Sequence, residues 1–134
     1  MESWLPTKKE IDELVQFLPL LYAKDFIPVK KLGVGKNEDG VSYWPGLEYE
    51  KEVDNFISAA SQEFWFDRQY DPKESSKMLK SEQNIAKESL QEIKTMLTFC
   101  IRGERFCDGH FGSMIKAGKI KSILKRLKVI MEEY

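Results

Sequence analysis

One stretch near the C-terminus repeats apolar side chains at the spacing of an α-helix more regularly than any other part of the chain. Between residues 119 and 132 the apolar positions form one stripe, and basic side chains cover the rest of the surface. The stripe consists of Ile120, Ile123, Leu124, Leu127, Ile130 and Met131. An amphipathic helix of this kind is stabilised mainly by packing of its apolar face. We therefore predict a helical domain in which this helix belongs to the core, covering the apolar sector of residues 85–101.

Length and composition agree with one packed domain over residues 1–134. The 134-residue chain is 42% hydrophobic and 32% charged, which favours a folded core over disorder. Its net charge of −1 excludes a globally basic nucleic-acid binder. Two cysteines are too few for a disulfide framework, and no apolar run reaches the roughly 18 residues of a membrane span. A cytoplasmic location, with no membrane association, is the expectation.

Apolar periodicity predicts a mainly α fold of about five helices around one long central helix. Thr7 and Glu10 have the spacing of a capping box, and Asp71 followed by Pro72 is typical of a helix start. The expected helices cover residues 8–23, 49–65, 72–101, 109–117 and 119–132, with a break near Ser81 as an alternative for the long one. Asp108 is the expected N-cap of the fourth, and Gly118 is expected just past its end.

Residues 24–46 differ in composition from the predicted helices. Six glycines and prolines interrupt short β-prone pieces in this stretch. This pattern predicts extended chain with turns and one short β-hairpin, with a tight turn at residues 38–40.

Charge is distributed unevenly along the chain. Residues 38–71 carry nine acids and two bases, a net charge of −7, whereas residues 102–134 carry eight bases and four acids, a net charge of +4. Three interpretations stay open. The charges lie on solvated helix faces, the basic surface meets an acidic partner or a polyanion, or the two regions pack against each other.

The sequence gives little support for a metal or a cofactor. Cys100, Cys107 and His110 are the only strong metal ligands near one another, and a structural zinc site needs four. The glycines at residues 33–35 precede a lysine without the spacing of a phosphate-binding loop. We expect no metal and no cofactor.

Residues 102–110 are the strongest candidate for a site. Ionisable side chains surround glycines and an aromatic residue between two predicted helices. The candidate residues are Arg102, Glu104, Arg105, Asp108 and His110, with Asp67 as a further member. Arginines beside acids in such a junction form ion pairs that fix the angle between helices, or they line a ligand site. We expect Arg105 and Asp108 to be partly buried and paired.

The same residues carry a resemblance. The run Arg105-Phe106-Cys107-Asp108-Gly109-His110 resembles the Arg-Phe-x-(Asp/Glu)-Gly-His signature of a family of small prokaryotic proteins of unknown function. In that family a short helix, a glycine turn and a basic helix follow the signature, as residues 110–131 do here. Further matching positions are Arg102, Gly118, Ile120, Ile123, Leu124 and Arg126. Cys107 stands at a variable position, and Arg68 stands where the family often has Trp. The resemblance implies a domain identity and no activity.

Three function classes remain compatible with the sequence. The first is a helical interaction or regulatory module that binds a protein partner or itself. The second is a nucleic-acid-associated protein, because residues 109–131 follow helix-turn-helix order. Its expected polyanion contacts are Lys119, Lys121, Lys125, Arg126 and Lys128. The third is an enzyme of unknown reaction centred on residues 102–110.

Overall fold

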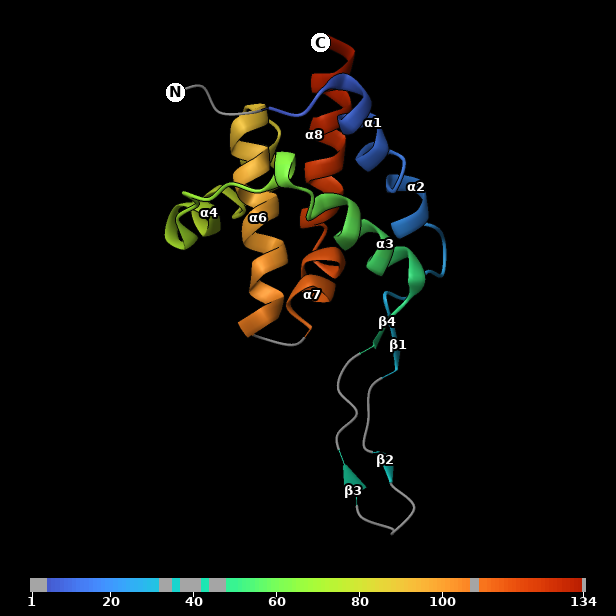
Figure 1. Ribbon diagram of the computed structural model, residues 1–134. Helices are drawn as coiled ribbons and strands as arrows, with labels where there is room; N and C mark the ends of the chain where they lie inside the picture. The colour runs from blue at the N-terminus through green and yellow to red at the C-terminus, as the bar shows by residue number, and fades with distance from the viewer. Residues whose placement is uncertain (1–4, 32–34, 37–41, 44–47, 107–108, 134) are drawn as a thin grey trace.

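The structure is a computed structural model that describes residues 5–31, 35–36, 42–43, 48–106 and 109–133. It is mainly helical (Figure 1). The first half of the chain contains α1 (Lys8–Val15), α2 (Leu18–Leu21), α3 (Lys51–Ala60) and the 3-10 helix η1 (Glu63–Trp65). The second half contains α4 (Pro72–Met78), α5 (Glu82–Ile85), α6 (Leu90–Phe106), α7 (His110–Lys116) and α8 (Lys119–Glu133). The described residues thus hold more helices than the five expected.

Helices α6 and α8 are the longest, and the other helices pack around them. Figure 1 shows α8 between α6 and α1, and α8 also contacts α7, α5 and α2. The stripe of α8 faces inward, with Ile120, Ile123, Leu124 and Leu127 fully buried. Burying four aliphatic side chains contributes on the order of 6–12 kcal/mol of transfer free energy before entropy is subtracted. The prediction that this helix belongs to the core is confirmed, although it covers α1 as well as α6.

The N-terminal helix begins as expected and ends early. The Thr7 hydroxyl accepts a hydrogen bond from the Glu10 amide, and the Glu10 carboxylate accepts one from the Thr7 amide. The single helix expected over residues 8–23 is instead α1 followed by α2. Pro19 occupies the first turn of α2, where its missing N–H costs no hydrogen bond.

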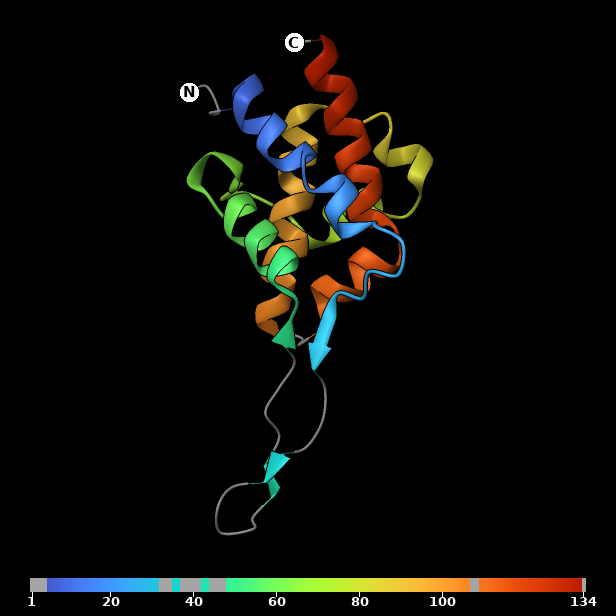
Figure 2. The same ribbon diagram turned by 90° about the vertical axis from the view of Figure 1, so that its right-hand side faces the viewer.

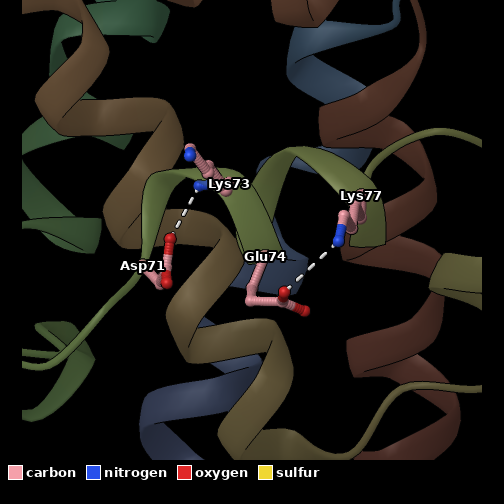
Figure 3. Close-up of polar contacts among 4 residues, drawn as sticks. All are labelled: Asp71, Lys73, Glu74 and Lys77. Carbon is pink, nitrogen blue, oxygen red and sulfur yellow. Dashed lines mark hydrogen bonds and ion pairs between the residues drawn. The ribbon is translucent and has the colours of Figure 1, made fainter.

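The single long helix expected over residues 72–101 is wrong. It is α4, α5 and α6, and each has its own N-terminal cap. The Asp71 carboxylate accepts from the Lys73 amide at 2.8 Å at the start of α4, and within this helix Lys77 pairs with Glu74 (Figure 3). Ser81 caps α5. Ser89 and Glu92 form a reciprocal box before α6, with distances of 3.1 and 3.2 Å.

Short strands lie between α2 and α3. They are β1 (Val29–Lys31), β2 (Gly35–Lys36), β3 (Ser42–Tyr43) and β4 (Glu48–Tyr49). β1 pairs with β4 and β2 with β3, both antiparallel. In both views β2 and β3 lie away from the helices (Figure 2). The hairpin expected here is not confirmed, because its turn at residues 38–40 lies outside the described residues.

Candidate functional site

Glu104 holds the junction between α6 and α7 together. Its carboxylate accepts hydrogen bonds from the amides of Gly109 at 3.0 Å and Phe111 at 2.8 Å, at the start of α7. It also accepts one from the Tyr49 hydroxyl at 2.7 Å. The N-terminus of a helix has unpaired N–H groups and a positive dipole end, so a carboxylate placed there is stabilising. Glu104 therefore works as a remote helix cap.

Tyr49 extends this network to the base of the β1–β4 pair. The side chain is buried, and its hydroxyl accepts from the Gly112 amide at 2.9 Å while donating to Glu104. A Cβ at Gly112 would come within 3.0 Å of the Tyr49 ring, so the close approach needs a glycine. No local pattern in the sequence points to Tyr49, because the residues that its hydroxyl contacts lie more than fifty positions away.

Gly109 takes the N-cap position of α7 that was expected for Asp108. Its φ of +91° lies in the left-handed region, which glycine adopts without steric cost. Asp108 and Cys107 lie outside the described residues, as does the side chain of Arg105. The expected pairing of Arg105 with Asp108 therefore stays a prediction.

His110 lies against α6. Its ring meets the Phe99 ring edge to face, with centroids 5.6 Å apart. A side chain at Gly103 would overlap the imidazole, so Gly103 makes room for it. Nε2 of His110 is buried and has no hydrogen-bond partner within the described part of the chain. The Glu104 carboxylate accepts its hydrogen bonds from Gly109, Phe111 and Tyr49 and not from His110.

The guanidinium of Arg102 lies over two aromatic rings. The guanidinium carbon is 5.5 Å from the centroid of Phe66 and 5.9 Å from that of Tyr70, both on the segment after η1. Nε of Arg102 is buried without a hydrogen-bond partner among the described residues. The side chain makes no ion pair there either. We call Arg102, Phe66 and Tyr70 the arginine bracket.

Asp67 lies beside the arginine bracket but bonds to α6 by other contacts. Its carboxylate accepts from the Thr95 hydroxyl at 2.5 Å and from the Gln69 amide at 2.9 Å. Its own amide donates to the Thr98 hydroxyl at 2.9 Å. These bonds attach the aromatic segment to the middle of α6. Asp67 thus bonds to the helix that carries Arg102 and Glu104, but among the described residues it makes no hydrogen bond to either of them.

The five predicted polyanion contacts on α8 divide into two groups. Lys119 donates to the Lys80 carbonyl, and Arg126 donates to the Glu88 carbonyl at 2.8 Å, so both hold α8 to neighbouring segments. Lys121, Lys125 and Lys128 are exposed. Nζ of Lys121 lies 5.7 Å from the centroid of the Tyr22 ring.

Tyr22 fixes the turn between α7 and α8. Its hydroxyl donates to the Ile115 carbonyl at 3.0 Å and accepts from the Lys121 amide at 2.9 Å. Burial raises the pKa of Tyr22 to about 12, so the phenol stays protonated. Gly118 lies just past the end of α7 with φ +79°, as expected.

Of the three strong metal ligands in the sequence, the structure describes Cys100 and His110. Cys100 is fully buried on α6, and burial raises the pKa of its thiol to about 12. Among the described residues, no three His, Cys, Asp or Glu side chains are grouped to hold a metal ion. Cys107 falls outside that part of the chain.

Together these elements form a mainly helical domain. Within the described residues, no helix is long and apolar enough to cross a membrane. The model of the DUF6508 family, a family of unknown function, matches residues 6–133, and the chain belongs to this family. Neither the curated proteins nor the solved structures gave a match.

Proposed function

We propose that this protein is a helical interaction module that binds a protein partner at the face formed by α6 and residues 66–70. The observation that carries the proposal is the arginine bracket. Arg102 is half-buried, lies over two aromatic rings and has no ion-pair partner among the described residues. Arginine and aromatic side chains are enriched at the energetic centres of protein interfaces.

Binding is better supported than catalysis at this junction. A general acid or base must reach the reacting group in a bound substrate. Both oxygens of the Glu104 carboxylate accept bonds that cap α7, and both oxygens of Asp67 accept bonds from its own segment and α6. A hollow of about 460 Å³ lies elsewhere, between α1 and the end of α3.

A quantitative pull-down tests the proposal. The tagged chain is used as bait in an extract of the organism that encodes it, beside Arg102→Gln and the control Lys24→Gln. Lys24 is an exposed lysine outside α6 and residues 66–70, so it controls for loss of one positive charge away from the proposed face. We expect the wild type and Lys24→Gln to retain the same partner and Arg102→Gln to lose at least about nine-tenths of it. Equal retention by all three folded baits contradicts the proposal for this face.

Nucleic-acid binding is the second candidate, and one observation favours it. Lys121, Lys125 and Lys128 are exposed on α8, and none forms an ion pair with a described residue. The triple change to Gln should abolish any salt-sensitive affinity for duplex DNA, measured by fluorescence anisotropy at several salt concentrations. If the wild type binds with no dependence on salt, or does not bind, this candidate is wrong.

The proposal also includes location and origin. Two cysteines, one of them a buried thiol, suit a reducing compartment, and we propose the cytoplasm. We further propose that the Arg-Phe-x-(Asp/Glu)-Gly-His run marks a prokaryotic family. Aligning the sequences of family members tests the motif, and their source organisms test the origin.

A further inference from the structure

In the arginine bracket, the outer end of the Arg102 guanidinium is available to a ligand. Nε of Arg102 is buried, and the side chain as a whole is half-buried, so the outer nitrogens are the part that a ligand can reach. Two aromatic rings hold the guanidinium in place, which removes much of the entropy that an arginine loses on binding. A preorganised cation of this kind binds an anion more tightly than a free surface lysine does.

No carboxylate among the described residues lies within ion-pair distance of Arg102. The oxygens of Asp67 accept from Thr95 and Gln69, and the oxygens of Glu104 accept from Gly109, Phe111 and Tyr49. The two other arginines whose side chains the structure describes do have polar partners. Arg68 pairs with Glu63, and Arg126 donates to a carbonyl. Arg102 differs from them because its polar atoms have no such partner in the described part of the chain.

We propose that the arginine bracket binds the carboxylate of an aspartate or glutamate side chain on the partner protein. This inference rests on the proposed function and specifies its ligand. A carboxylate is planar, and its two oxygens match the two outer nitrogens of a guanidinium. The half-buried rings of Phe66 and Tyr70 would pack against an apolar residue beside the acid.

A phosphate group fits the same place less well. A phosphorylated side chain carries about two negative charges and is repelled by neighbouring carboxylates. Asp67 directly follows Phe66, and Asp71 directly follows Tyr70. The acidic surroundings therefore favour a singly charged ligand over a doubly charged one.

Titration of the isolated protein with short peptides tests the ligand class. The Nε–Hε signal of Arg102 is followed by ¹⁵N NMR while N-acetyl-Leu-Glu-Leu-amide is added at constant ionic strength. The Leu-Gln-Leu and Leu-phosphoserine-Leu peptides serve as comparisons. We expect saturation in the millimolar range with the Glu peptide, and binding at least about tenfold weaker with each of the other two. No shift with up to about 20 mM Glu peptide, or equal binding of the Gln peptide, overturns the proposal. Tighter binding of the phosphoserine peptide overturns it as well.

Two variants check that the bracket is responsible. Arg102→Lys keeps the charge but lacks the planar pair of donors, so the amide signal of Thr98 should report about tenfold weaker binding of the Glu peptide. Arg126→Lys, on α8 and outside the proposed face, is the matched control and should bind like the wild type. If Arg102→Lys also binds like the wild type, the geometry of the guanidinium is not what recognises the ligand.

The two proposals fail in different ways. If the peptides do not bind while partner retention in extracts still depends on Arg102, only the carboxylate assignment is wrong. If retention is independent of Arg102 while the Glu peptide binds, the bracket takes small carboxylates and the proposed interaction module is wrong.

Discussion

The α6–α7 junction and the outer face of α8 are both rich in charge, but they use it in opposite ways. In the junction, the Glu104 carboxylate accepts three hydrogen bonds that connect α6, α7 and β4. On α8, Lys121, Lys125 and Lys128 point into solvent from a helix whose other face is core. The charged side chain of the junction thus connects helices, whereas the three lysines of α8 make no ion pair with a described residue. A dense run of ionisable residues does not by itself indicate a site for chemistry.

The largest expected effect tests whether Glu104 is structural. Glu104→Ala should lower the free energy of unfolding by about 3 kcal/mol, because it leaves two amides of α7 and the Tyr49 hydroxyl without their acceptor. Urea unfolding followed by circular dichroism measures this, with the exposed Glu13→Ala as the control. Tyr49→Phe should cost less, and the double variant should cost less than the sum of the two single changes. An unfolding midpoint for Glu104→Ala equal to that of the control contradicts the capping role.

The second prediction concerns the contact of His110 with α6. Gly103→Ala should destabilise the protein by about 2 kcal/mol, because the added methyl group overlaps the imidazole. In a His110→Ala background the same change should be neutral or stabilising by up to about 1 kcal/mol, since alanine favours a helix more than glycine does. Thermal melts of the four chains measure both effects. Equal costs in the two backgrounds would mean that the ring does not lie against Gly103.

The third prediction concerns the pKa of Glu88, which lies just before the start of α6. The pKa of Glu88 is raised to about 7, chiefly by its hydrogen bond with Glu92, whose own pKa is lowered by the same bond. A raised native pKa adds stability that is complete below the ordinary value near 4.5 and is lost as pH rises through 7. Glu88→Gln keeps a hydrogen-bond donor for Glu92 at every pH. Its melting temperature should match that of the wild type near pH 4.5 to 5 and exceed it at pH 8. If the melting temperatures of the two proteins differ by the same amount at both pH values, the hydrogen bond with Glu92 does not raise the pKa of Glu88.

The smallest effect is expected on α8. Changing Lys121, Lys125 and Lys128 together to Gln should alter the free energy of unfolding by less than about 0.5 kcal/mol, because surface charges away from partners contribute little. Urea unfolding on the same scale as Glu104→Ala makes the comparison direct. A loss above about 2 kcal/mol would show that these lysines hold the fold, as Glu104 does.

Local sequence signals predicted several helix ends, and one further signal of the same kind is present before α6. The Thr7–Glu10 box, the Asp71 cap and the glycine after α7 all lie where the residues indicate. Ser89 and Glu92 have the spacing of a second box, which marks the start of α6 inside the stretch that was taken as one long helix. Apolar residues continue through that stretch because each of its helical segments contributes buried or partly buried side chains to the core.

The sequence by itself determined which faces are apolar and where most helices begin, because both depend on side chains a few positions apart. Only the tertiary structure decided the role of the charges. Glu104 meets Tyr49 across 55 residues, and Arg102 meets Phe66 and Tyr70 across more than thirty. A hydrogen bond or a cation–π contact depends on a few ångströms of distance, and the folded chain sets that distance between residues that are far apart in sequence. For that reason two neighbours on one helix, an acid and a base, have different surroundings: Glu104 caps α7, and Arg102 lies over two aromatic rings.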